Sequence, residues 1–443
     1  MSSRWTKLHA VVGALCFFAA ASTLSAADPD RTFLYSGEIR KFVPERAPTP
    51  PLYISGGTLI DGSGAAPRPN PGLLIRAGVF ESIGATAVPA DAARIDATGK
   101  WILPGLFDVH AHITFYFPAG FNVEDDSLNA IRSERFLEAY QRVGITTVRD
   151  VASRNHVGYS LKRAQRLGLA GGARLYVSGP GITVTGGHAT EFEPYEPAVY
   201  AVEGDGPWEL RKRVREAAKL GADLIKTFPP LTEDELRAIV DEAHSWQLRV
   251  TSHVGGFQDS GRLSARRAVD AGVDSLEHLY PYGDERTTPA VLADIARKHI
   301  YVVPTLRFHL NELARATGAR SLWLELQIHH DRQTMMALFH DMQKAGIKFA
   351  VGTDSNAPDM PTIGAVYREE LAALANGGLS AMQVIQAATL NGAATMGLQN
   401  EAGTIVAGKW GDLVILAANP LENLDSMVAP DHVIQAGATV YRR

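Results

Sequence analysis

The sequence predicts an α/β protein whose larger part is a (β/α)8 barrel, a TIM barrel, joined to a small β-sandwich domain built from both chain ends. Two observations support this. After Trp101, short apolar segments typical of strands alternate with amphipathic segments typical of helices, often with a repeat of about 25 to 30 residues. That spacing is expected when a barrel of about 250 residues is divided among eight strand-helix units. On either side of this region, short β-rich runs alternate with turns instead.

The N-terminus, residues 1–27, predicts a cleaved secretory signal peptide. Basic residues precede an apolar run over residues 11–20, and small residues follow, with cleavage expected near Ala26 or Ala27. The apolar run is about half of the ~20 residues that a membrane-spanning helix needs. Cys16, the only cysteine, lies inside this segment, so the mature chain has no disulfides. We therefore expect a periplasmic or secreted protein whose mature form has no membrane anchor.

The β-rich regions at the two ends are each too short to bury a sheet face alone. Runs such as Leu73–Arg76, separated by turns such as Asp61-Gly62, predict an antiparallel unit, and β character returns at Gly403–Ile405 and over residues 411–416. Before them lies a charged, proline-rich stretch typical of a linker. The expected organisation is a signal peptide over 1–27, a linker over 28–51, a composite β-sandwich over 52–103 and 403–443, and the barrel over 104–402.

Eight segments within the barrel region have the length and apolar composition of buried parallel strands. They are Phe107–His112, Thr146–Asp150, Arg174–Ser178, Leu224–Lys226, Arg249–His253, Ser275–His278, Tyr301–Thr305 and Phe349–Thr353. Amphipathic segments predict helices over 208–220, 233–246, 363–374 and 381–389. Thr232 and Glu235 form a capping-box pattern at the start of the second. An open doubly wound sheet has no support, because no glycine-rich dinucleotide motif follows an early strand.

The charge balance argues against nucleic acid and anionic membranes as partners. The formal net charge is −5, evenly spread, and no basic run interrupts it. We expect a small-molecule substrate; the sequence leaves open whether the protein is a homo-oligomer.

Side chains of metal-ligand type stand at the C-terminal ends of the predicted strands. His110 and His112 are two residues apart, so a strand presents both on one face. The C-terminal ends of parallel barrel strands converge on one mouth, where this fold carries its chemistry. The candidate ligands are His110, His112, Lys226, His253, His278 and Asp354.

Each candidate also has an ordinary structural interpretation. His253 and His278 could be hydrogen-bonded core histidines, and Asp354 could be a turn or N-cap residue. Lys226 is the most informative, because burying an ammonium group among apolar neighbours is costly. It could pair with a carboxylate, or its neutral amine could take up carbon dioxide to become N6-carboxylysine, a carbamate able to bridge two metal ions.

An ordered set of motifs resembles the metal-dependent amidohydrolase superfamily, and within it the imidazolonepropionase-like branch with the Xaa-Pro dipeptidases. The similarity extends over nearly everything after Tyr53. The motifs are Pro104–His112, Gly186–His188, Ala222–Lys226, Ser275–His278, Val303–Thr305, Gly352–Asp354, Thr389–Ala393 and the closing stretch over 403–420.

The resemblance implies a binuclear metal site. It assigns one divalent ion to His110, His112 and Asp354, a second to His253 and His278, and a bridge of carboxylated Lys226 and hydroxide between them. Zinc is the metal that it implies, consistent with nitrogen and oxygen ligands and no thiolate.

The expected reaction is hydrolysis of an amide bond by the metal-bridging hydroxide. Two cations lower the pKa of the shared water and polarise the substrate carbonyl. Asp354 would take the proton from the nucleophile and pass it to the leaving amine. The expected substrate is a dipeptide, an Xaa-Pro dipeptide or an N-acyl amino acid.

Substrate contacts are predicted at four further residues. His188 matches a substrate-binding element of relatives, or is an ordinary loop histidine. Tyr280 and Arg307 follow strands and could bind a substrate carboxylate. Tyr116 occupies a similar place, although loop aromatics often pack only against loops.

Three other functions compete with amide hydrolysis. The same hydroxide could hydrolyse a lactone or an organophosphate ester. A mononuclear deaminase of the superfamily typically lacks the lysine found here as Lys226. A binding protein that has lost catalysis predicts that at least one ligand is missing, and none is.

Overall fold

A computed structural model describes residues 50–85, 87–115, 125–190, 199–254, 265–278, 288–316 and 332–443, without the side chains of 312–316. The predicted signal peptide, nearly all of the linker, Tyr116 and Tyr280 lie outside these residues. No helix within the described ranges combines the length and apolar character needed to cross a bilayer.

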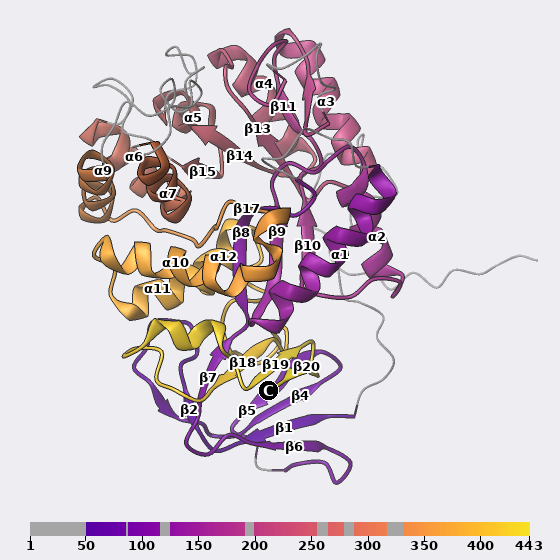
Figure 1. Cartoon of the computed structure of the whole chain (residues 1–443), viewed down its shortest axis with the longest axis vertical. Coiled ribbons are helices and arrows are strands. Elements are labelled where there is room, and N and C mark those ends of the chain that lie inside the picture. The colour runs from indigo at the N-terminus through magenta and orange to yellow at the C-terminus, as the bar shows by residue number, and fades with distance from the viewer. Residues whose placement is uncertain are drawn as a thin grey trace, which may run out of the picture. The chain divides into compact units, whose positions relative to one another are not determined.

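The larger part of the chain is an α/β fold in which parallel strands alternate with helices (Figure 1). One sheet has the strand order β10-β9-β8-β17 and the other β12-β11-β13-β14-β15-β16, with every pair parallel. Their bounds are β8 Leu106–His112, β9 Ile145–Asp150, β10 Arg174–Val177, β11 Gly181–Thr183, β12 Ala201–Glu203, β13 Leu224–Thr227, β14 Arg249–Val254, β15 Ser275–His278, β16 Tyr301–Val303 and β17 Ser355–Asn356. Seven of the eight predicted strands are present, with bounds within two residues of those expected.

A break separates β10, which is the third predicted strand, from a further short strand, β11. β10 pairs with β9, whereas β11, which the sequence pattern did not reveal, pairs with β13 and β12. The break falls at Gly179, which has a φ of +71°, and Pro180, which has no N–H for a ladder. A hydrogen bond of 2.8 Å from Asp223 N to Val177 O nevertheless connects the two sheets here.

The eighth predicted strand, Phe349–Thr353, is not a regular strand. Within this described segment a single bridge pair joins Phe349 to Val302, and Val109 N donates to Val351 O at 2.9 Å. The N–H of Val351 donates to Ala387 O, on a helix, at 3.2 Å and so leaves the ladder, and Gly352 packs so closely that an added Cβ would lie 2.5 Å from the Cβ of His110. The chain therefore passes against β8 before it forms the short β17.

Helices connect and cover the parallel strands (Figure 1). The capping box at Thr232 and Glu235 is confirmed, with Thr232 N donating to Glu235 Oε2 at 2.8 Å. The four predicted helices correspond to α3, α4, α10 and α11. The bounds are α1 Asp126–Arg142, α2 Val157–Arg166, α3 Gly206–Leu220, α4 Glu233–Ser245, α5 Ala265–Ala271, α6 Pro289–Arg297, α7 Leu306–Ala316, α9 Arg332–Lys344, η2 Ala357–Thr362, α10 Ile363–Asn376, α11 Ala381–Ala388, α12 Leu390–Thr395 and η3 Leu424–Val428.

Strands from both chain ends share one sheet, of order β20-β19-β18-β7-β2-β3, and a second sheet has the order β5-β4-β1-β6. Apolar side chains from both sheets, including Ile54, Phe80, Leu413 and Ile434, form a common core. The bounds are β1 Leu52–Ser55, β2 Thr58–Leu59, β3 Arg68–Pro69, β4 Leu73–Arg76, β5 Val79–Ile83, β6 Ala93–Asp96, β7 Trp101–Pro104, β18 Leu413–Leu416, β19 His432–Gln435 and β20 Ala438–Arg442.

Two expectations about these sheets need correction. The pairing is mixed rather than antiparallel throughout, because β1 runs parallel to β6 and β2 parallel to β7. The predicted strand at Gly403–Ile405 is a bend that contributes one backbone bond of 2.9 Å, from Ile405 N to Asp61 O. A left-handed φ of +81° at Gly403 is incompatible with a continuous strand.

Candidate metal centre

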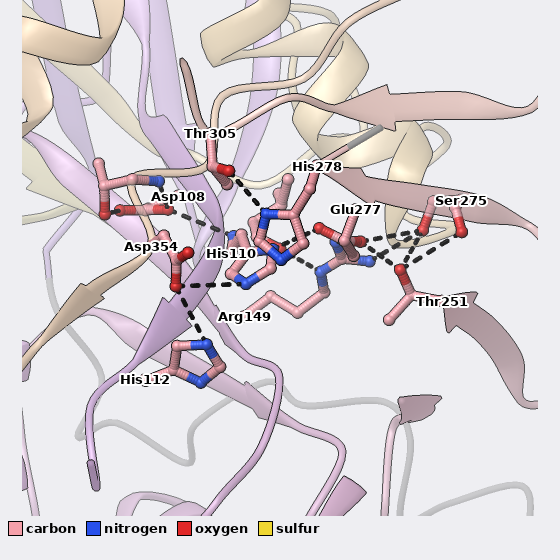
Figure 2. A network of polar contacts seen from close by, with 12 residues as sticks. Asp108, His110, His112, Arg149, Thr251, Ser275, Glu277, His278, Thr305 and Asp354 are labelled. Carbon is pink, nitrogen blue, oxygen red and sulfur yellow. Dashed lines mark hydrogen bonds and ion pairs between the residues drawn. The ribbon is translucent and has the colours of Figure 1, made fainter. Parts of the chain in front are cut away.

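The C-terminal end of β8 carries His110 and His112, and Asp354 faces both (Figure 2). Asp354 Oδ1 lies 3.5 Å from His110 Nε2 and 3.2 Å from His112 Nε2. His110 is completely buried, and the His112 side chain is 16% exposed. Residues 244 positions apart in the chain are therefore brought into contact at one strand end, as the sequence predicts.

Asp108 anchors the segment that carries Asp354. Its carboxylate accepts hydrogen bonds from Thr353 N at 3.0 Å, from Thr353 Oγ1 at 2.6 Å and from Tyr140 Oη at 3.2 Å. All three partners are buried, so the residue just before Asp354 is held rigidly against β8.

Further histidines extend the cluster from β8 across to β14. The ring of His278 lies 4.8 Å from that of His110, and the ring of His253 lies 4.4 Å from that of His278. Beyond them, the ring of His188 lies 4.9 Å from that of His253. Potential ligand atoms of His110, His278 and Asp354 all lie within 4.8 Å of one another.

Lys226, near the end of β13, lies close enough to His110, His253 and His278 for its charge to add to burial in lowering their pKa values. It is 1% exposed, and its Nζ has no hydrogen-bond partner among the described residues. Burial lowers the pKa of its amine to about 8, against the opposing influence of Glu277 and Asp354. The amine is therefore far easier to deprotonate than that of an exposed lysine.

The protonation states suit cation binding. Burial, assisted by the charge of Lys226, lowers the pKa of His110 to about 4. Burial also lowers the pKa values of His253 and His278 well below the usual value, so all three rings are neutral at pH 7. Burial alone would raise the pKa of Asp354, but its surroundings, including His112 at 3.2 Å, lower it below the usual range.

Glu277, a residue that the sequence pattern did not single out, determines how His110 is protonated. Glu277 Oε2 lies 2.6 Å from His110 Nδ1 (Figure 2). Burial would raise the pKa of Glu277, but Arg149 and His110 lower it below the usual range, so it is a carboxylate. Only Nδ1–H can donate to a carboxylate, which leaves the lone pair of His110 on Nε2, facing Asp354.

His278 has a corresponding support on its other flank. His278 Nδ1 lies 2.8 Å from Thr305 Oγ1, which lies 3.0 Å from Nε2 of the buried His309 on α7. The motif Val303–Thr305 marked this place, but His309 carried no signal in the sequence beyond its residue type.

The strand ends around the cluster turn through left-handed backbone. The φ angles are +73° at His278, +45° at Thr305 and +53° at Asp354. Such angles are uncommon for residues with side chains and persist where the surrounding structure imposes them. The three angles turn the backbone at the points where these side chains enter the cluster.

The predicted substrate contacts have different outcomes. His188 lies at the cluster, with its ring 5.1 Å from that of Phe228. Arg307 is instead engaged by acidic side chains: its Nε lies 3.0 Å from Glu369 and its Nη2 lies 3.6 Å from Asp359. The structure therefore gives no support to Arg307 as a substrate contact, while Tyr116 and Tyr280 fall outside the described residues.

The donor set fits a divalent cation. It consists of imidazole nitrogens, a carboxylate and a deprotonatable amine, with no thiolate. Within the described part of the chain, His110 Nε2 and Lys226 Nζ are buried without hydrogen-bond partners. Buried polar atoms rarely remain unsatisfied, so both atoms indicate a missing partner at the cluster.

Residues 101–440 match the model of the amidohydrolase family. The chain belongs to this family. Amidohydrolases are metal-dependent hydrolases of small molecules, so this protein is an enzyme, and the resemblance inferred from its motifs is confirmed.

Individual relatives place this amidohydrolase more closely. It is 25% identical over 407 residues to an imidazolonepropionase from Thermoplasma acidophilum, covering 84% of this chain and 90% of that protein. A crystal structure of a Xaa-Pro dipeptidase with bound methionine has a TM-score of 0.74 and 25% identity, covering 89% of this chain and 100% of that one. A prolidase complexed with N-methylphosphonate-L-proline has the same TM-score and coverage with 26% identity.

Proposed function

We propose that this amidohydrolase uses two divalent metal ions to hydrolyse an amide bond in a dipeptide, an Xaa-Pro dipeptide or an N-acyl amino acid. Zn²⁺ is the metal that we propose for both ions. The observation that carries the proposal is the distance of 3.5 Å between His110 Nε2 and Asp354 Oδ1. Both atoms are acceptors, because Glu277 holds the proton of His110 on Nδ1. Two lone pairs facing each other in a buried site repel, and a cation beside both removes the repulsion.

The ligands we assign follow from the cluster. His110, His112 and Asp354 would hold one ion, His253 and His278 the other, and Lys226 would join them. The amine of Lys226 would form an N–C bond to carbon dioxide and release a proton, giving a carbamate, whose oxygens would be ligands of the type that divalent ions take. When bound, such ions polarise a carbonyl and lower the pKa of water, so that hydroxide is available to attack near neutral pH.

Asp354 is the residue that we assign to proton transfer. Its pKa is held below the usual range, so it is ionised and able to accept the proton of the attacking water. Delivery of that proton to the departing nitrogen completes cleavage of the C–N bond, since an amine leaves more readily than an amide anion.

The amide substrate rests on the relatives. An imidazolonepropionase, a Xaa-Pro dipeptidase and a prolidase all act on C–N bonds, and each covers most of this chain. His188, beside His253, is the described side chain that we assign to substrate binding.

We also propose that the parallel strands close into a (β/α)8 barrel over 104–402 and that residues 52–103 and 403–443 form a β-sandwich. Two hydrogen bonds support closure. Asp223 N donates to Val177 O of β10 at 2.8 Å, and Ala350 N donates to Val302 O of β16 at 3.1 Å. The apolar core shared by the two terminal sheets supports the sandwich. From the N-terminal pattern, we propose export to the periplasm or the medium.

The test is metal analysis combined with a substrate screen of the purified mature chain. We expect two metal ions per chain and turnover of dipeptides or N-acyl amino acids. A lactone or phosphotriester hydrolysed faster than every amide would replace the substrate class while retaining the site. A chain that binds no divalent ion would overturn the proposal.

A further inference from the structure

We propose that Glu277 is a positioning residue that fixes His110 in the Nδ1–H tautomer and thereby sets the affinity of the site for its metal. This inference rests on the proposed function, because it assumes that His110 Nε2 is a metal ligand. The residue itself contacts neither substrate nor metal in this assignment.

The carboxylate of Glu277 has four polar contacts among the described residues, all to buried partners. It is completely buried, and its carboxylate accepts from His110 Nδ1 at 2.6 Å, from Arg149 Nη2 at 2.6 Å, from Ser275 Oγ at 3.4 Å and from Thr251 Oγ1 (Figure 2). An ionised carboxylate offers about four lone-pair positions. Oε1 takes three of these contacts and Oε2 takes the one to His110, so the carboxylate is held by Arg149, Thr251 and Ser275 on one oxygen and turns the other toward His110.

Arg149 balances the charge of Glu277 from inside the fold. Its guanidinium is buried, and besides Glu277 it donates to Val109 O and to Ser275 Oγ. The carboxylate is therefore neutralised before any metal binds, and its remaining strong interaction is with His110. That arrangement makes the imidazole a better electron donor at Nε2 without adding net charge to the site.

The backbone at His278 brings a second side chain of β15 to His110. In a regular strand, Glu277 and His278 would point to opposite faces. Glu277 contacts Nδ1 of His110, and the φ of +73° at His278 turns the ring of His278 to within 4.8 Å of the same ring. Two neighbouring residues of β15 thus lie beside His110: Glu277 accepts its Nδ1 proton, and His278 is a candidate metal ligand.

The test compares zinc release from the full-length mature enzyme and its variants into a colorimetric chelator. For Glu277→Gln we expect release about 10- to 100-fold faster than from the wild type, the usual effect of removing such a supporting group. Glu277→Asp retains the charge on a shorter side chain and should restore part of the difference.

Thr251→Val is the matched control. It removes another donor to the same carboxylate but leaves the contact with His110, so it should lower the melting temperature and leave zinc release unchanged. If Glu277→Gln does not fold because Arg149 is left unpaired, the double variant Arg149→Met/Glu277→Gln removes both charges and should show the same faster release. Release equal to that of Thr251→Val would overturn this inference alone, whereas a wild type without zinc would overturn both proposals.

Discussion

The carboxylate of Asp354 faces His110 Nε2 at 3.5 Å, while the backbone N–H of Asp354 donates to the carbonyl oxygen of His110 at 2.8 Å. The backbone hydrogen bond thus holds the two side chains at this separation. It keeps two acceptor atoms close together, where only a proton or a cation makes the contact favourable.

Replacement of Asp354 by asparagine should reduce kcat at least about 100-fold, because the amide cannot accept a proton from the attacking water. The amide oxygen can still act as a ligand, so we expect metal content to be largely retained. Steady-state kinetics and metal analysis of the same preparation check this. Asp241→Asn, at an exposed acid on α4, is the control; undiminished turnover of Asp354→Asn would refute the proton-transfer role.

Replacement of Lys226 by methionine should abolish activity and stabilise the metal-free protein. The Nζ of Lys226 is buried without a partner among the described residues, whereas methionine has similar volume and no charge. We expect a gain of about 1 to 3 kcal/mol in unfolding free energy, the typical cost of an unsatisfied buried polar group. Denaturant unfolding after metal removal measures it. A less stable variant would mean that the apo protein already satisfies the amine.

Metal removal should lower both stability and activity reversibly. A ligand that binds only the folded state stabilises it by about 4 kcal/mol at 1,000 times its dissociation constant. We therefore expect the melting temperature to fall after chelation and to recover with Zn²⁺. His110→Ala should lose most of this response, whereas His244→Ala, whose histidine pairs with Asp274 at 2.9 Å, should keep it. An equal response in both variants would argue against His110 as a ligand.

Stability should fall between about pH 5 and pH 8 through Glu370. This buried carboxyl accepts from Leu306 N at 3.1 Å and Arg307 N at 2.7 Å, and burial raises its pKa from 4.5 to about 8. Because the folded state binds this proton more tightly than the unfolded state, raising the pH through the folded pKa removes stability. Glu370→Gln keeps an acceptor oxygen for the two N–H groups and should flatten the melting-temperature profile over this range. A profile as steep as that of the wild type would assign the loss to another group.

Sequence alone located most of the fold and the candidate site. The period of two places His110 and His112 on one strand face, and the repeating strand-helix pattern places Lys226, His253 and His278 at equivalent strand ends. These are local properties, since residue spacing and composition determine them without knowledge of distant partners. The motifs also identified the family, because they occur together in a fixed order over most of the chain.

Tertiary structure decided what local patterns do not encode. Alternation predicts opposite faces for Glu277 and His278, yet with a left-handed φ at His278 both side chains lie beside His110. Likewise, segment 349–353 is not a regular strand, since Val351 N bonds to Ala387 O on α11 and not to a neighbouring strand. Arg307 looks available in the sequence, but acidic side chains of other elements engage it. In each case the outcome depends on contacts between residues distant in the chain. Residue spacing and composition do not specify such contacts, because they form only when the whole chain packs.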